Sequence, residues 1–207
     1  KKRRIFDWGL AVLGRKAQAH FERRGLSIPD SIAAALADRL VAKKIRERVG
    51  GRLRLCISGG AALHPKVMEF FFAIGIPVLE GYGLTETSPV ICLNRPGHEI
   101  PGAVGPAVPG VEVKIGESGE ILTRGPHVMM GYWQDPAATK ESIQDGWLHT
   151  GDLGSIDGDG YLSITGRKKD LIVTAGGKNI APAALEALLI QDPFIEQALV
   201  YGDARPF

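Results

Sequence analysis

The residues with the clearest chemical potential lie beside glycines in the middle of the chain. Thr85 and Glu86 follow the stretch Gly81-Tyr82-Gly83 after one leucine. A hydroxyl and a carboxylate there could bind a phosphate and Mg²⁺, because Mg²⁺ is held by one or two carboxylates together with phosphate oxygens. The same pair also suits a helix start, where Thr85 would cap the backbone and Glu86 would favour the helix dipole. The residue types leave both interpretations open.

Three further segments place aromatic or charged side chains next to glycines. Tyr82 could stack on a nucleotide base, although a buried tyrosine is more often part of a core. The segment Thr150-Gly151-Asp152 would present a carboxylate to a pair of hydroxyls, or form an Asx turn. The segment Gly166-Arg167-Lys168-Lys169-Asp170 is a turn with three cations, and its charge alone favours a solvated surface loop.

A parallel sheet is the element that would position the first of these residues. Residues 53–57 and 76–80 read as short apolar strands, with a helix over 65–73 between them. Strand, helix and strand in so few residues predict a parallel βαβ unit with a right-handed crossover. In such sheets ligands bind beyond the carboxyl ends of the strands. Those ends are predicted at Ser58-Gly59-Gly60-Ala61 and Gly81-Tyr82-Gly83.

The flanking regions have different patterns. Before the βαβ unit, residues 3–24 predict an amphipathic helix, either on the surface of a globular domain or docked on a membrane or partner, and a second helix is predicted from Asp30 or Ser31 to Val49. After it, alternating residues punctuated by Gly and Pro predict antiparallel strands. These predicted strands cover 111–115, 120–123, 147–149 and 160–164, with a polar helix near 136–143. A separate α+β unit is predicted next, with strands at 171–173 and 195–201 and a helix over 182–190.

Composition excludes several classes of protein. The 207 residues contain 25 Lys and Arg against 23 Asp and Glu, and a net charge of +2 argues against nucleic acid or an anionic membrane as the main partner. An apolar fraction of 44% excludes a largely disordered chain. Two cysteines cannot form a disulfide framework or a four-cysteine zinc site, and they indicate reduced thiols. The sequence contains no apolar run long enough for a membrane span. We therefore expect a cytoplasmic protein, with a position peripheral to a membrane left open.

Taken together, four segments resemble the AMP-forming adenylating superfamily, which includes acyl-CoA synthetases, luciferases and the adenylation domains of peptide synthetases. The segments are Tyr82-Gly83-Leu84-Thr85-Glu86-Thr87, Trp147-Leu148-His149-Thr150-Gly151-Asp152, Gly160-Tyr161-Leu162 and Gly166-Arg167-Lys168-Lys169-Asp170. Their order and spacing match the superfamily over residues 55–205. The stretch 43–60 and Asn179-Ile180-Ala181-Pro182 are most similar to the long-chain fatty acid–CoA ligase branch.

The resemblance implies an α/β fold with two domains. Residues 1–168 would be the C-terminal part of the large AMP-binding domain, a parallel βαβ portion followed by a small antiparallel β region. Residues 169–207 would be the hinge and the first part of a mobile, incomplete α+β C-terminal domain. We expect the chain to be an internal fragment of a longer protein, because the superfamily's phosphate loop and late catalytic lysine are not found in it. We therefore expect these residues alone to release no pyrophosphate from ATP and fatty acid.

The resemblance also implies residue roles. The glycine turn at 59–61 would cover one face of adenine and Tyr82 the other, Thr85 would contact the α-phosphate, Glu86 would bind Mg²⁺, and Asp152 would accept hydrogen bonds from the ribose with Arg167 beside it. The full nucleotide-binding set is Gly59, Gly60, Ala61, Glu80, Gly81, Tyr82, Gly83, Thr85, Asp152 and Arg167. We expect these glycine turns and polar pairs to converge on one adenylate.

Two further roles concern movement and the second substrate. Lys169 matches the hinge residue, and it joins Thr85 and Glu86 in the implied catalytic set. Gly176, Gly177 and Lys178 would face the pantetheine path of coenzyme A.

The function that the resemblance implies is an ATP-dependent long-chain fatty acid–CoA ligase. It would form acyl-AMP and then acyl-CoA, with pyrophosphate and AMP released, and its partners would be fatty acid, ATP and CoA, with no nucleic acid. Two alternatives stay open, an adenylating ligase for another carboxylic acid and a non-catalytic nucleotide- or acyl-CoA-binding module on the same fold. The sequence assigns neither acyl chain length nor oligomeric state.

Overall fold

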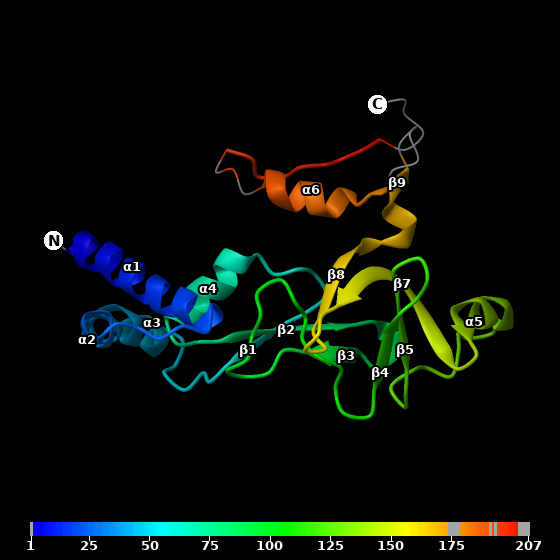
Figure 1. Ribbon diagram of the computed structural model, residues 1–207, viewed down its shortest axis with the longest axis horizontal. Coiled ribbons are helices and arrows are strands. Elements are labelled where there is room, and N and C mark those ends of the chain that lie inside the picture. The colour runs from blue at the N-terminus through cyan, green and yellow to red at the C-terminus, as the bar shows by residue number, and fades with distance from the viewer. Residues whose placement is uncertain (1, 174–178, 191, 193, 203–207) are drawn as a thin grey trace. The chain divides into compact units, whose positions relative to one another are not determined.

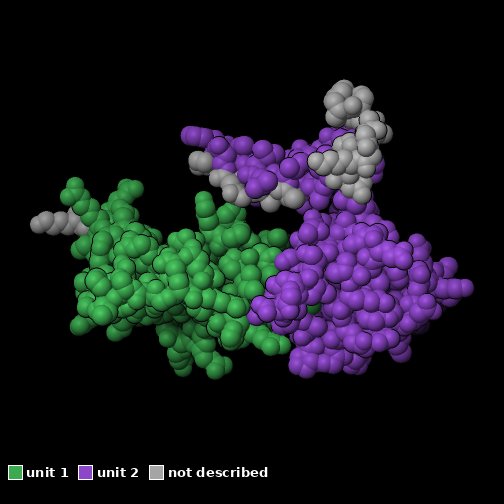
Figure 2. All heavy atoms as spheres, viewed as in Figure 1, with its two compact units in different colours: residues 1–83, 92–105 green, residues 84–91, 106–207 purple. Residues whose placement is uncertain are grey.

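The computed structural model describes residues 2–173, 179–190, 192 and 194–202 (Figure 1). The chain divides into two compact units, which Figure 2 colours separately. Unit 1 comprises residues 1–83 and 92–105, and unit 2 comprises residues 84–91 and 106–207. The predicted boundary between residues 168 and 169 stays a prediction.

Unit 1 begins with a helical layer. The helices are α1 (Lys2–Phe21), α2 (Ile28–Ala37), a π-helical turn η1 (Asp38–Ala42), α3 (Lys43–Arg48) and α4 (Pro65–Ala73). The side chain of Ser27 caps α2 by accepting from the Asp30 amide at 3.2 Å, which moves the helix start ahead of the predicted Asp30 or Ser31. The predicted second helix therefore exists, but a π-helical turn divides it.

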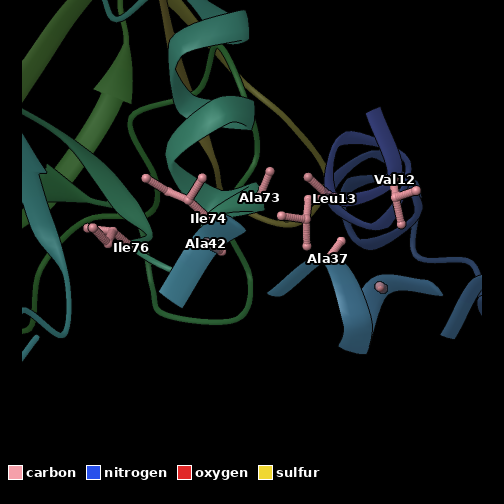
Figure 3. Close-up of a cluster of buried hydrophobic side chains, with 9 residues drawn as sticks. Val12, Leu13, Ala37, Ala42, Ala73, Ile74 and Ile76 are labelled. Carbon is pink, nitrogen blue, oxygen red and sulfur yellow. The ribbon is translucent and has the colours of Figure 1, made fainter. Parts of the chain in front are cut away.

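The helices pack on one apolar cluster (Figure 3). Leu13 of α1, Ala37 of α2, Ala42 of the π-turn and Ile74 beyond α4 are all buried there. Gly9 of α1 permits a close approach to the π-turn, since a Cβ at this position would lie 2.5 Å from Val41 Cγ2. This packing buries one face of α1, as expected for a helix of a globular domain. None of the helices in the described part of the chain is long and apolar enough to cross a membrane.

The predicted βαβ unit is confirmed. Strand β1 (Cys56–Ser58) pairs in parallel with β2 (Val78–Gly83), α4 connects them, and β3 (Val90–Leu93) completes the sheet in the order β1-β2-β3. Both cysteines are free, and burial raises the pKa of Cys92 in β3 to about 12.

The strand boundaries differ from the prediction. Residues 53–55 lie outside β1, because its ladder with β2 begins only where Cys56 faces Val78. The carboxyl end of the second strand was predicted at Gly81-Tyr82-Gly83, and this is confirmed. These residues are the last three of β2, so the strand continues past Glu80, where the predicted strand ended.

Unit 2 contains the predicted antiparallel strands. The sheet has the order β4 (Glu112–Ile115), β5 (Glu120–Arg124), β7 (Trp147–Ile156), β6 (Ile143–Gln144), and β8 (Leu162–Arg167) pairs with β7. Helix α5 (Pro136–Ser142) precedes β6. Strand β7 is far longer than the predicted 147–149, because Asp152 to Ile156 pair with β8.

The last described elements are small. A 3-10 turn η3 (Lys168–Asp170) leads to β9 (Ile172–Val173), which pairs antiparallel with β10 (Asn179–Ile180), and α6 (Pro182–Leu189) follows. The strand predicted at 195–201 is wrong, since residues 195–202 are described and form no strand. Leu199 is exposed there, and the Val200 amide donates to the Glu186 side chain at 2.8 Å instead of to a neighbouring strand.

Candidate functional site

Unit 2 contains a polar cavity of about 640 Å³. Four residues singled out from the sequence line it, and they come from three separate parts of unit 2: Glu86, Asp152, Arg167 and Lys169. Two residues with no predicted role, Glu120 and Tyr132, line it as well. The sequence therefore identified polar residues that the fold of unit 2 brings together.

Asp152 and Arg167 face each other across two strands. The register of β7 and β8 pairs them, and Arg167 Nε donates to Asp152 Oδ1 at 2.9 Å. The Asp152 side chain is 6% exposed and that of Arg167 is 51% exposed, so the carboxylate is the buried member of the pair. The Asx-turn alternative is wrong, because Asp152 lies inside β7.

The backbone before Asp152 is bent. Gly151 has φ +72°, a backbone conformation that glycine adopts at less cost than other residues. The hydroxyl of Thr150 makes two hydrogen bonds. Its Oγ1 donates to the Ile121 carbonyl at 2.7 Å and accepts from the Asp152 amide at 3.1 Å. Neighbouring groups in unit 2 thus fix the backbone that carries the Asp152 carboxylate.

Glu86 lies in a short 3-10 turn, η2 (Thr85–Thr87). The capping side chain is Thr87, whose Oγ1 accepts from the Leu84 amide at 2.9 Å, so the expectation that Thr85 would cap a helix here is wrong. The Thr85 side chain is exposed, and Thr85 is not among the residues that line the cavity.

Tyr132 contacts Glu86 from a distant part of the sequence. Its hydroxyl donates to Glu86 Oε1 at 2.9 Å, and this hydrogen bond raises the pKa of Tyr132. The Met129 amide donates to the Glu86 carbonyl at 2.8 Å. Sequence reasoning missed Tyr132, because nothing in the local pattern around residues 129–133 points to residue 86.

Glu120 is a buried carboxylate at the start of β5. Oε1 accepts from the Gly151 amide at 3.0 Å, and Oε2 lies 3.2 Å from Lys168 Nζ and 3.4 Å from His149 Nδ1. Burial acts to raise the pKa of Glu120, but these donors outweigh it and hold the pKa below its ordinary value. An acidic residue at the head of an apolar strand was the only sequence signal for Glu120.

The implied hinge and coenzyme A residues are described only in part. Lys169 lines the cavity from η3, one residue after the cation that pairs with Glu120. Gly176, Gly177 and Lys178 lie outside the described residues.

The remaining nucleotide-binding residues belong to unit 1. A Cβ added at Gly59 would lie 3.4 Å from the Gly81 carbonyl oxygen, so these two glycine segments are side by side. Gly60 has φ +85° and needs glycine for that reason, whereas Ala61 is an exposed loop residue. At the end of β2, Gly83 is half-buried. The predicted proximity of the two glycine segments is observed within unit 1.

Glu80 and Tyr82 are both buried in β2. Tyr82 is 7% exposed, which is the environment of a core tyrosine, and its predicted stacking on adenine stays a prediction. The Leu63 amide donates to Glu80 Oε1 at 3.1 Å and so ties β2 to the loop after β1. Burial raises the pKa of Glu80 against the opposing effect of the Leu63 and Gly102 amides. Oε2 is buried without a hydrogen-bond partner of normal geometry in the described part of the chain.

The donor chemistry around Glu86 suits Mg²⁺ only together with a phosphate ligand. Among residues 2–173, 179–190, 192 and 194–202, no group of three or more His, Cys, Asp or Glu side chains could hold a metal ion. Mg²⁺ commonly takes one or two carboxylates and completes its coordination with water and substrate phosphates. Glu86, half-buried at the edge of a polar cavity, fits that pattern.

Two solved structures share this fold. ATP-bound MatB from Rhodopseudomonas palustris is 40% identical, with a TM-score of 0.67 over 75% of this chain and 33% of its own. The o-succinylbenzoate CoA synthetase of Bacillus subtilis with its acyl-adenylate intermediate is 30% identical, with a TM-score of 0.68 over 86% of this chain and 41% of its own.

Residues 27–133 match the family described as AMP-binding enzyme, and the chain belongs to that family. A long-chain-fatty-acid–CoA ligase of Mycobacterium bovis, FadD15, is 50% identical over 84% of this chain and 29% of its own length. A putative fatty-acid–CoA ligase of Mycobacterium tuberculosis, fadD11, is 44% identical over 100% of this chain and 37% of its own length. The chain thus spans about a third of the curated relatives that it matches.

Proposed function

We propose that the full-length protein containing this chain is an ATP-dependent ligase that joins a long-chain fatty acid to coenzyme A through an acyl-AMP intermediate. Membership of the AMP-binding enzyme family supports an adenine nucleotide as substrate. The relatives named as fatty-acid–CoA ligases support a fatty acid as the second substrate. The observation that carries the proposal is the cavity in unit 2, where Glu86, Asp152, Arg167 and Lys169 meet.

In the first half-reaction, a carboxylate oxygen of the fatty acid attacks the α-phosphorus of ATP. The bond from that phosphorus to the bridging oxygen breaks, and pyrophosphate leaves with the electron pair. Asp152 accepts hydrogen bonds from the ribose hydroxyls, and Arg167 holds the Asp152 carboxylate in place through the bond at 2.9 Å. The Thr85 hydroxyl donates a hydrogen bond to the α-phosphate. These residues act by positioning and by electrostatic complementarity, as is general for phosphoryl chemistry.

Glu86 holds Mg²⁺ in this proposal, and the ion supplies neutralisation of the phosphate charge when it is bound. The Tyr132 hydroxyl orients the Glu86 carboxylate and leaves its other lone pairs available. On unit 1, the glycines at 59, 60 and 81 allow backbone to approach the adenine closely, and Tyr82 packs against the ring.

In the second half-reaction, the sulfur of coenzyme A attacks the acyl carbonyl carbon. The bond from that carbon to the AMP oxygen breaks, AMP leaves, and the thiol proton passes to solvent. Lys169 is the pivot about which the C-terminal residues turn between the two half-reactions.

The proposal is tested on the full-length protein by ATP–pyrophosphate exchange and by thioester formation. Palmitate, octanoate, benzoate and malonate are offered separately with ATP, Mg²⁺ and coenzyme A. We expect palmitate to give the highest kcat/KM, and Asp152→Ala to lower kcat/KM for ATP at least tenfold because it removes a charged hydrogen-bond acceptor. A protein that shows no acid-dependent exchange with any of the four acids is not a ligase, and the non-catalytic binding module then becomes the better interpretation.

A second candidate, a ligase for another carboxylic acid, is favoured by the structural relatives. These relatives include an o-succinylbenzoate CoA synthetase and an anthranilate CoA ligase in complex with anthranoyl-AMP. A higher kcat/KM for benzoate or malonate than for palmitate would select this candidate.

A further inference from the structure

Glu120 is a buried, hydrogen-bonded side chain that lines the cavity and has no role in the proposed reaction. Its side chain is 8% exposed, and it accepts from a backbone amide on β7 and from a cation that follows β8. A buried carboxylate is costly unless donors satisfy its oxygens. Its oxygens accept from the Gly151 amide, which precedes Asp152 in the chain, and from Lys168, which follows Arg167.

The bond at Oε1 acts on the backbone next to Asp152. The Gly151 amide donates to Glu120 Oε1 at 3.0 Å, and this is the residue with φ +72°. The register of β5 with β7 shifts at this point, and within these two fully described strands Gly151 has no partner in that register. Glu120 therefore supplies an acceptor that the sheet does not provide there.

The bond at Oε2 balances charge. Two carboxylates, Glu120 and Asp152, line one cavity, and two consecutive cations pair with them. Arg167 Nε lies 2.9 Å from Asp152 Oδ1, and Lys168 Nζ lies 3.2 Å from Glu120 Oε2. Each of the two acidic side chains thus lies beside a cation of its own in the same cavity.

We propose that Glu120 is a positioning residue for ribose recognition, since its carboxylate fixes the Gly151 amide and so aims Asp152 at the ribose hydroxyls. The inference rests on the proposed function, which assigns the ribose to Asp152. Glu120 itself touches neither substrate nor metal. Its effect on the reaction passes through the backbone of residues 150–152.

The experiment measures discrimination between ATP and 2′-deoxy-ATP by the full-length protein, as the ratio of the two kcat/KM values for acid-dependent pyrophosphate release. We expect Glu120→Ala to lower this ratio roughly fivefold, the size of one lost hydrogen bond, mainly through KM for ATP. Glu120→Gln keeps an acceptor for the Gly151 amide and is expected to retain most of the ratio. Glu117→Ala removes an exposed carboxylate from the turn before β5 and is the matched control, with no expected change.

The ratio separates positioning from a general structural effect. A variant that only weakens the fold loses activity with both nucleotides and keeps its ratio, and an unchanged ratio in Glu120→Ala would overturn the inference. If Glu120→Ala does not fold, Glu120→Asp decides, because its shorter side chain keeps the charge but falls short of the Gly151 amide. Equal ratios for Glu120→Asp and Glu120→Gln would then overturn it.

The outcomes also distinguish this inference from the proposed function. Asp152→Ala is expected to reduce discrimination against 2′-deoxy-ATP more than any Glu120 variant does. If Asp152→Ala lowers the ratio and Glu120→Ala does not, the inference alone fails. If the wild-type protein does not discriminate, or Asp152→Ala leaves its ratio unchanged, the ribose role of Asp152 fails and the inference fails with it.

Discussion

Replacing Glu86 by Gln tests the proposed Mg²⁺ ligand with little disturbance of its surroundings. The Glu86 carboxylate accepts from the Tyr132 hydroxyl at 2.9 Å, and a Gln carbonyl oxygen can accept the same bond. The Met129 amide donates to the backbone of residue 86 and is unaffected. The substitution therefore removes a charge and leaves the local hydrogen bonds in place.

The magnitude follows from the exposure of the site. Two unit charges about 4 Å apart interact by about 1 kcal/mol in water, so a divalent cation gains about 2 kcal/mol from one carboxylate at that distance. Glu86 is half-buried, and its effective dielectric is lower than that of water, so this figure is a lower estimate. A change of about 2 kcal/mol corresponds to a roughly 30-fold increase in the Mg²⁺ concentration that gives half-maximal rate.

The assay is pyrophosphate release by the full-length protein against free Mg²⁺ at fixed ATP, together with AMP binding measured without Mg²⁺. We expect Glu86→Gln to shift the Mg²⁺ midpoint and to leave AMP affinity within threefold of wild type. Glu141→Gln is the matched control, because Glu141 is an exposed carboxylate that lines the same cavity and its loss changes net charge equally. Equal shifts in the two variants, or a Glu86→Gln midpoint like that of wild type, would refute the reasoning.

Three further outcomes are expected. Burial raises the pKa of Glu80, so its contribution to stability is fully present below the ordinary carboxyl pKa and is lost as pH rises through the raised value. In chemical denaturation, the free energy of unfolding of Glu80→Gln should therefore increase relative to that of wild type from pH 5 to pH 8. A difference that does not change with pH would contradict this. Gly154→Ala would place a Cβ 2.5 Å from a carbonyl oxygen of β8, and we expect it to lower the free energy of unfolding by about 3 kcal/mol. Gly151→Ala meets open space but has φ +72°, and we expect it to lower the free energy of unfolding by about 1 kcal/mol. The reverse order in urea unfolding would be inconsistent with this packing. Tyr132→Phe removes the hydroxyl that orients Glu86 and should raise the Mg²⁺ midpoint about threefold, with no change expected in AMP binding.

Local patterns were sufficient for several elements. The helix predicted over 65–73 is α4 with the same bounds, because Pro65 starts it and Gly75 follows its end. The alternation in 111–115 predicted β4, whose residues alternate between exposed and half-buried, as in a strand with one solvent-facing side. The stretch 120–123 predicted β5, in which all four of these residues are buried. The polar helix near 136–143 is α5, capped by Asp135.

Long-range pairing determined where those patterns failed. Residues 150–156 contain three glycine or serine positions and gave no strand signal, yet they extend β7 because β8 lies beside them. Residues 195–201 have a strand-like apolar pattern, yet residues 195–202 form no strand, because in the described structure no neighbouring strand pairs with them. A strand is stabilised by its neighbour, and a single stretch of sequence does not contain that information.

The sequence by itself determined which residue types stand next to which glycines, and this was enough to single out Glu86, Asp152, Arg167 and Lys169 and to indicate the AMP-binding enzyme family. Only the tertiary structure revealed Glu120 and Tyr132, because their partners lie between 29 and 48 residues away in the chain. Motif residues can be recognised from the sequence because they are neighbours along the chain. Hydrogen-bond partners that hold those residues in place come from distant strands, turns and loops, and only the packing of these elements decides which of them meet.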